Sequence, residues 1–156
     1  MADILTGHDV LGAVVPFNVT QKTDAPAAWH CGTEGALTIE TVSGPHQNQL
    51  RDTFDRAGQA VNFVDNITAV QWGKLLVNLN NGLNALSGGT LRGGLLQRPY
   101  RAALAAMISE ALNVLSRAGI TPAAFGKASP QKMIKILRLP NWLYKIIMQR
   151  IVKIDA

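Results

Sequence analysis

The stretch from residue 71 to residue 86 constrains the fold of this chain more than any other. It runs Gln-Trp-Gly-Lys-Leu-Leu-Val-Asn-Leu-Asn-Asn-Gly-Leu-Asn-Ala-Leu. Its leucines recur at steps of three and four residues, which is the spacing of one apolar face of a helix. Such a face needs other elements to cover it. We therefore predict a central helix around which the rest of the chain is organised.

Polar side chains form a second stripe on the same predicted helix. Lys74, Asn78 and Asn81 project within an arc of about 60° at roughly 100° per residue. An ammonium group and two carboxamides in a line suit a small, polar anion as ligand. The alternative is a solvated helix face, since most lysines and asparagines are exposed. Asparagine is a poor helix former, yet it occupies positions 78, 80, 81 and 84, and this favours a functional role.

Composition and cysteine content define the broad class of the chain. With 156 residues, 47% of them hydrophobic and 16% charged, the chain is long and apolar enough to bury a core. The single cysteine, Cys31, excludes an intrachain disulfide and favours a reducing compartment. The sequence has neither the pattern of a signal peptide nor about 18 consecutive apolar residues. We expect a soluble, cytoplasmic protein and no association with a membrane.

Positive charge is concentrated at the C-terminal end. Residues 1–126 hold 8 Lys+Arg against 9 Asp+Glu, whereas residues 127–156 hold 7 Lys+Arg against one Asp. This basic tail alternates cations with apolar residues, a pattern that suits an anionic membrane surface. Nucleic acid is not expected as a partner, because no nucleic-acid-binding module accompanies the tail. The alternative, which we favour, is that its apolar face packs on the helices of residues 66–118 or on the C-terminal part of the domain that the chain lacks.

The first 65 residues predict a small strand-rich segment. The expected elements are a strand at 10–19, a polar turn at 20–26, a neighbouring strand at 36–42, a helix at 46–57 and a short strand at 61–64. This order contains no complete βαβ unit for binding a nucleotide.

From residue 66 onward the pattern is helical. We expect Asp65 or Asn66 to cap the central helix, Ser87-Gly88-Gly89 to close it, and Gly93-Gly94 to lie in the following loop. The further helices expected are one at 99–118, two short ones opened by Thr121-Pro122 and Ser129-Pro130, and a last one at 142–154.

Trp72-x-Lys74-Leu75-x-x-Asn78, followed by Asn84-Ala85-Leu86, resembles the first core helix of the C-terminal domain of ketopantoate reductases. The resemblance extends over most of the chain. Segments 14–19 and 32–37 resemble the last strands of that family's dinucleotide domain. Segments 100–110, 118–120 and 137–140 resemble its later helices.

The resemblance implies an α+β fold with two parts. Residues 1–65 would be a partial dinucleotide-binding domain, the remnant of a Rossmann-type domain that contributes its last strands and a helix. Residues 66–156 would be an all-helical substrate-binding domain that is truncated at its C-terminus. A homodimer formed through the helical domain is a further expectation.

The activity that the resemblance implies is the NADPH-dependent reduction of 2-dehydropantoate, a 2-oxo acid, to pantoate in pantothenate biosynthesis. Lys74 would be the catalytic residue that supplies a proton to the new hydroxyl, and Asn78 would bind the substrate. The family places a further Asn eight residues after the lysine, where this chain has Gly82, so Asn81 is the candidate to replace it. Glu110 is either a partner of Lys74 or a solvated surface residue.

The parts that would make such an enzyme complete are missing from the sequence. No Gly-x-Gly-x-x-Gly is present, so no residue can be assigned to binding NADPH. The histidines and Cys31 lack metal-ligand spacing, and no metal is expected. We therefore expect little activity from the chain alone. The alternative function is a non-catalytic helical module whose basic tail binds a partner or an anionic membrane surface.

Overall fold

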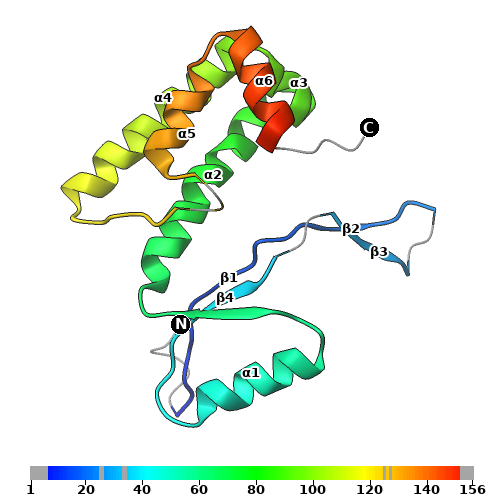
Figure 1. The fold of residues 1–156 in the computed structure, drawn as a ribbon, viewed down its shortest axis with the longest axis vertical. Helices are drawn as coiled ribbons and strands as arrows, with labels where there is room; N and C mark the ends of the chain where they lie inside the picture. Colours follow the sequence, from blue (N-terminus) through cyan, green and yellow to red (C-terminus); the bar gives the residue numbers. More distant parts are fainter. Residues whose placement is uncertain (1–6, 25–26, 33–34, 125, 127, 152–156) are drawn as a thin grey trace. The chain divides into compact units, whose positions relative to one another are not determined.

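The computed structural model of the chain describes residues 7–24, 27–32, 35–124, 126 and 128–151. The chain divides into two compact units, Met1–Gln71 and Trp72–Ala156, drawn in Figure 1. Among the described residues, the first unit carries the strands, one complete helix and the start of a second, and the other unit consists of helices. The α+β class predicted from the sequence, with a small strand-rich part before an all-helical part, is confirmed.

A three-stranded sheet organises the first unit. Its order is β1 (Ala13–Val14), β4 (Leu37–Glu40), β5 (Val61–Val64), with β1 antiparallel and β5 parallel to the central strand. Helix α1 (His46–Arg56) connects β4 to β5, as Figure 1 shows. Parallel neighbours need such a crossover, so a βαβ connection is present, although it lacks a Gly-rich turn. The parallel pairing of β4 with β5 could not be predicted from the sequence, because the residues of a strand do not indicate which other strand it pairs with.

The prediction of a single strand over residues 10–19 is wrong, because this segment is divided between the three-stranded sheet and a separate two-stranded hairpin. Strand β1 ends at Val14 and β2 (Val19–Gln21) pairs antiparallel with β3 (Trp29–Cys31) in a second sheet. Pro16 lies between β1 and β2 and has no N–H to donate to a ladder, so the strand is interrupted there. All six residues of the hairpin strands are exposed.

The core of the first unit is small. It consists of the buried side chains of Val14, Ile39, Val61 and Ile67. Ile67 begins helix α2, and it packs so close to Gly12 that a Cβ at position 12 would lie 2.9 Å from its Cγ2. The sheet is also tied to the segment before β1, because the Gly12 N–H donates to Glu40 Oε2 at 3.0 Å.

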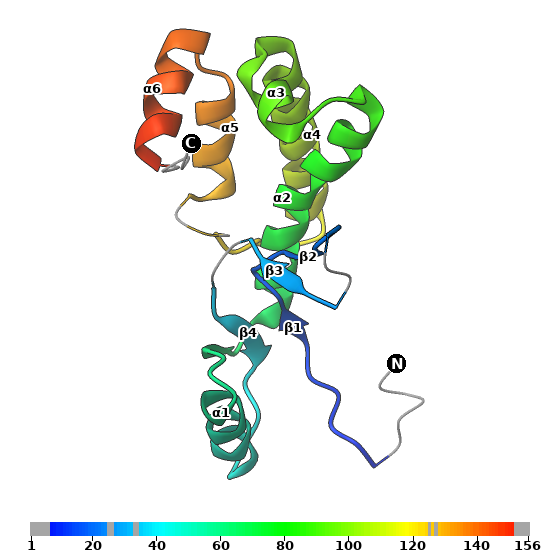
Figure 2. The ribbon, with the colours of Figure 1, turned by 90° about the vertical axis from the view of Figure 1, so that its right-hand side faces the viewer.

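The described residues beyond position 66 form five helices, and Figure 2 shows them from a second direction. They are α2 (Ile67–Ser87), α3 (Leu91–Leu96), α4 (Arg98–Arg117), α5 (Pro130–Leu137) and α6 (Asn141–Ile151). Asn66 caps α2, since its Oδ1 accepts from the Ala69 N–H at 3.0 Å, and Gly88 follows the helix with a φ of 64°. Ser129 caps α5 as predicted.

One cluster of buried side chains forms the core of the helical unit. Its members are Leu76 on α2, Leu104, Ala105, Ile108 and Leu115 on α4, Leu137 on α5, and Tyr144 on α6. The apolar faces of α5 and α6 thus contribute to the core. The packing interpretation of the basic tail is confirmed for this part of it.

Two predictions for the helical unit are wrong, namely the loop at Gly93-Gly94 and the short helix that begins at Thr121-Pro122. Gly93 and Gly94 lie inside α3, which Thr90 caps by accepting from the Gly93 N–H at 3.1 Å. Gly94 is required there by the ring of Tyr100, which would lie 2.7 Å from an added Cβ. The short helix expected at Thr121-Pro122 is absent from the described residues 121–124. The last predicted helix is present as α6, while its expected residues 152–154 lie outside the described residues.

A buried arginine joins four helices. Arg101 on α4 has no exposed surface and its guanidinium donates to Leu95 O at the end of α3 (3.0 Å) and to Leu137 O at the end of α5 (3.2 Å). It also donates to Leu139 O (2.9 Å) and to Asn141 Oδ1 at the start of α6 (2.7 Å). Carbonyls at helix C-termini lack intrahelical partners and carry partial negative charge. They therefore stabilise this cation without a carboxylate.

None of the helices described in the structure is both long and apolar enough to cross a membrane.

Candidate functional site

Lys74, Asn78 and Asn81 lie on one continuous helix, α2, within the helical unit. The side chain of Lys74 is half-buried, whereas Asn78 and Asn81 are exposed. Four residues of helix span about 6 Å, so Lys74 and Asn78 are separated by the length of a small organic acid. The structure thus brings the three predicted side chains onto one accessible stripe. Their roles in binding and catalysis stay predictions.

The residues close to Lys74 in the sequence differ in their burial. Trp72 packs against the buried core, while Leu75 is 46% exposed. Gly73 is buried, and a Cβ at this position would collide with the carbonyl oxygen of Ala123. The segment after α4 therefore lies directly against α2 beside the lysine. Replacing Gly73 would displace this segment and change the shape of the site.

The other two asparagines of α2 have a different explanation. Asn80 is half-buried, and its Oδ1 accepts a hydrogen bond from Tyr100 Oη on α4 at 2.9 Å. Asn84 follows one turn later and is also half-buried. Asn80 therefore faces α4, whereas the buried Oδ1 of Asn84 has no hydrogen-bond partner within the described part of the chain. The cluster of four asparagines is thus divided between two half-buried residues and the exposed pair at 78 and 81.

Position 82 has room for the side chain that the resemblance places there. Gly82 is exposed, and an added Cβ would meet no atom within 4 Å. Its φ lies outside the left-handed region. An asparagine at this position would therefore be tolerated without steric strain, one turn beyond Asn78 on the same side of the helix.

The remaining candidates are dispersed. Glu110 is exposed on α4, as a solvated surface glutamate would be. His8, His30, Cys31 and His46 are exposed as well. Within the described part of the chain, no three His, Cys, Asp or Glu residues are grouped so that they could hold a metal ion.

A comparison with protein families decides the relationship of the chain. Residues 66–150 match the family described as "Ketopantoate reductase PanE/ApbA C terminal". This match covers more than half of the chain and includes α2 to α5 completely. The chain belongs to the ketopantoate reductase family. No curated protein and no solved structure matches it.

The matched part of this family member is its helical domain, and the resemblance noted from the sequence is confirmed there. The match begins at Asn66, which is the residue that caps α2. The assignment of residues 1–65 to a dinucleotide-binding domain stays a prediction.

The structural role of Arg101 was not predicted from the sequence, where this residue was included only in a segment that resembles the family. An arginine within an apolar stretch of helix, with no acidic residue nearby, was the available signal.

The described residues do not fit the pyrophosphate of a dinucleotide. In parallel α/β sheets such ligands bind beyond the carboxyl ends of the strands. At that end of β4 the structure has a cleft of about 450 Å³, and its charged side chains are those of Asp9 and Glu40. No lysine or arginine lines it, and the residue before α1, Pro45, provides no side-chain cap. Two carboxylates would repel phosphate groups, so this cleft does not suit the pyrophosphate of NADPH.

Proposed function

We propose that the helical unit binds the anion of a small 2-oxo acid along the stripe formed by Lys74, Asn78 and Asn81. The observation that supports this proposal is the position of the half-buried Lys74, one turn before an exposed asparagine, inside the region that matches the ketopantoate reductase family. The substrate that the resemblance implies is 2-dehydropantoate. Its reduction to pantoate, with NADPH as the reductant, belongs to pantothenate biosynthesis.

The chemistry of this reduction sets the roles of the residues. Reduction of the carbonyl group would place negative charge on its oxygen, which a nearby ammonium would stabilise. Lys74 would donate a proton to this oxygen to complete the hydroxyl group. Asn78 lies about 6 Å further along the helix and can donate a hydrogen bond to the carboxylate of the same molecule. Asn81 extends the stripe for the remaining polar atoms.

The part of the chain that the structure describes contains no seat for the cofactor, so the proposal separates binding from turnover. We expect the 156-residue chain to bind 2-dehydropantoate in calorimetry, but to oxidise NADPH with this substrate at no more than the rate of the blank. Lys74→Ala should weaken binding tenfold or more, because it removes a charged hydrogen-bond donor. Lys132→Ala is the matched control, since it removes an exposed lysine from α5 in the same unit. Equal affinities of the Lys74 variant and the unmodified chain would refute the site.

Position 82 offers a test in the opposite direction. Gly82→Asn restores the asparagine of the resembling family at a position where the structure has space for it. We expect this variant to bind 2-dehydropantoate more tightly by up to about tenfold, the value of one additional hydrogen bond. Gly89→Asn is the control, because Gly89 is exposed beyond the end of α2. A gain in both variants would show that the effect does not arise at this site.

The alternative function is a non-catalytic module that binds an anionic membrane surface or a partner. It is favoured by Trp142, which is 65% exposed on α6, and by exposed cations nearby on α5 and α6. Tryptophan and lysine are typical of helices that lie at a membrane interface. Co-sedimentation with vesicles containing anionic lipid, at low and at high salt, tests this alternative. Binding that is lost at high salt would support it, whereas no binding would exclude the membrane.

A further inference from the structure

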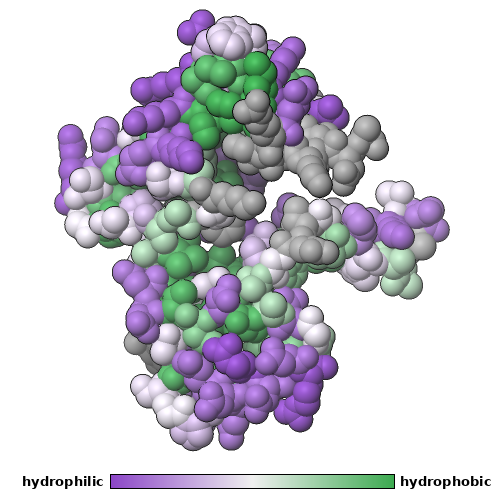
Figure 3. Space-filling view, in the orientation of Figure 1, coloured by the Kyte–Doolittle hydropathy of each residue, from purple (hydrophilic) through white to green (hydrophobic). Residues whose placement is uncertain are grey.

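An apolar cleft lies between α3 and α6 within the helical unit. Its volume is about 560 Å³, inside the range of about 300–1,000 Å³ that is usual for small-molecule sites. Leu91, Leu95 and Leu96 line it from α3, and Met148 lines it from α6. In Figure 3, apolar side chains gather over the part of the unit where α6 lies, with hydrophilic side chains on both sides. Leu91 and Leu96 are 46% and 43% exposed, so their apolar surface is accessible within this cleft.

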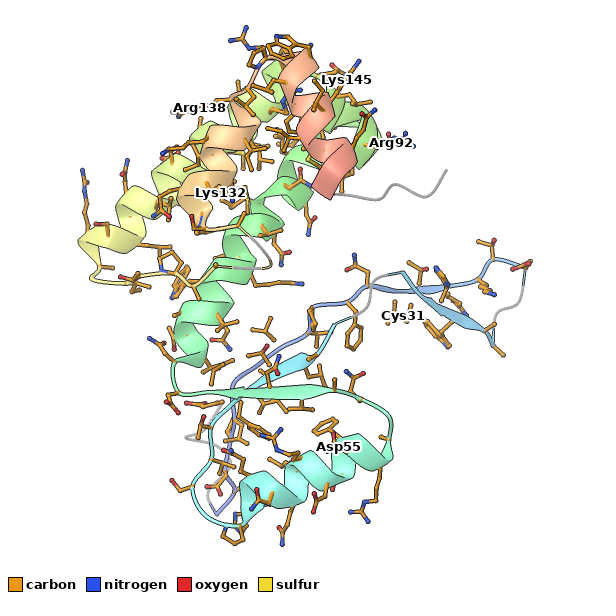
Figure 4. All side chains as sticks on the ribbon, viewed as in Figure 1. Cys31, Asp55, Arg92, Lys132, Arg138 and Lys145 are labelled. Carbon is orange, nitrogen blue, oxygen red and sulfur yellow. The ribbon has the colours of Figure 1, made fainter. Side chains whose placement is uncertain are left out.

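The charged side chains that line the cleft all have the same sign. They are Arg92 from α3 and Lys145 from α6, both exposed, and among the residues that the structure describes no aspartate or glutamate lines the cleft with them. Figure 4 labels both residues, which project from the neighbouring helices α3 and α6. An apolar cleft whose described charged side chains are two cations is complementary to a ligand that carries an anionic group on an apolar body.

The floor of the cleft is firmly held. Tyr144 lines the cleft, yet it is only 3% exposed, and its ring lies 4.1 Å from the guanidinium carbon of Arg101. The same guanidinium holds the start of α6 through Asn141 and the end of α3 through the Leu95 carbonyl. The two helices that form the cleft are therefore linked to one buried group. This makes the cleft a preformed site rather than a gap between independent elements.

We infer that this cleft binds a single-chain anionic amphiphile, such as a medium-chain alkyl carboxylate or alkyl phosphate. The head group would lie between Arg92 and Lys145, and the alkyl chain would cover the leucines of α3 and Met148. Small 2-oxo acids are too short and too polar to bury this apolar lining, so the site is distinct from the stripe around Lys74. A flat membrane surface is less complementary, because the apolar lining lies within a concavity.

Calorimetry with the full 156-residue chain, below the critical micelle concentration of each ligand, tests the inference. Dodecanoate and dodecyl phosphate should each bind with a stoichiometry of one, and octanoate should bind more weakly by about fourfold for each methylene removed and fully buried. Dodecanol keeps the alkyl chain without the charge, and it should bind about tenfold more weakly than dodecanoate. Equal binding of dodecanol and dodecanoate would overturn the role of the two cations.

Substitutions locate the binding. Arg92→Gln combined with Lys145→Gln should reduce the affinity for dodecanoate tenfold or more and leave that for dodecanol unchanged. The control pair is Arg117→Gln with Lys132→Gln, which removes the same charge from exposed positions outside the cleft. If both pairs weaken binding equally, the effect is one of net charge and the inference fails.

The apolar wall has its own test. Leu96→Asp places a carboxylate among the leucines and should abolish binding of both ligands, whereas Leu86→Asp should not, because Leu86 is 88% exposed and does not line the cleft. Both positions lie outside the buried core, so circular dichroism should show folded variants. Binding to anionic vesicles without binding to dodecanoate monomers would overturn the inference in favour of a membrane surface.

Discussion

Replacing Arg101 with methionine tests the central contact of the helical unit. Methionine keeps most of the apolar volume of the side chain but removes the guanidinium. Four acceptors then lose their donor: the carbonyl oxygens of Leu95, Leu137 and Leu139, and Asn141 Oδ1. A buried acceptor without a partner costs about 1–3 kcal/mol.

The size of the effect follows from where these acceptors lie. The bond to Leu137 is buried, whereas the other three are partly buried, so water can replace the donor at those positions. We therefore expect a cost of about 1 kcal/mol for each of the three partly buried acceptors and of about 3 kcal/mol for the buried Leu137 carbonyl. The contact with the Tyr144 ring is lost as well. The lost hydrogen bonds alone would cost about 6 kcal/mol. Removing the buried guanidinium also removes its own desolvation cost, which offsets part of this loss. We therefore predict a net decrease of roughly 3–5 kcal/mol in the free energy of unfolding, a large part of the 5–15 kcal/mol that is usual for a domain.

Urea denaturation followed by circular dichroism measures this decrease. Arg98→Met is the matched control, because Arg98 lies on the same helix and is exposed, and it should change the free energy by less than about 0.5 kcal/mol. Arg101→Lys should fall between the two, since lysine retains the charge but not the planar fork of donors. A change of less than about 1 kcal/mol in Arg101→Met would refute the view that this arginine holds the helices together.

Two further predictions concern the same unit. Burial raises the pKa of Tyr144, so the folded state keeps the phenolic proton at a pH where the unfolded state has released it. The free energy of unfolding should therefore fall as the pH rises above about 10. Urea titrations at successive pH values should show a smaller decrease for Tyr144→Phe over that range. Gly73→Ala should lower the free energy of unfolding by about 1–3 kcal/mol, because the new Cβ collides with the Ala123 carbonyl. This decrease is expected although alanine has the better helix propensity. A variant that is more stable in thermal unfolding would contradict this contact.

The candidate site could be predicted from the sequence only as far as one helix extends. The order of Lys74, Asn78 and Asn81 on a face follows from helical geometry, and the structure shows α2 as one helix through all three. Which asparagines point to solvent does not follow from α2 alone. Asn80 is explained by Tyr100, which is twenty residues away and on another helix. Only the packing of α4 on α2 separates Asn80 from Asn78 and Asn81.

Among the strands the sequence was a weaker guide. It located β4 and β5, but it did not show that they are parallel neighbours, nor that β2 and β3 form a separate hairpin. In the helical unit it misplaced Gly93 and Gly94, since two glycines are typical of a loop. The structure places them in a helix because the ring of Tyr100 leaves no space for a larger residue at position 94.

The sequence by itself determined the features that depend on neighbours along the chain: the apolar periodicity of α2 and α4, a cap at residue 65 or 66, the cap at Ser129, the basic tail and the family resemblance. The tertiary structure decided strand pairing, the burial of Arg101 among helix ends, and the cleft between α3 and α6. These features join residues that are far apart in sequence, and their free energies arise from burial and hydrogen bonds that exist only once the helices and strands have packed.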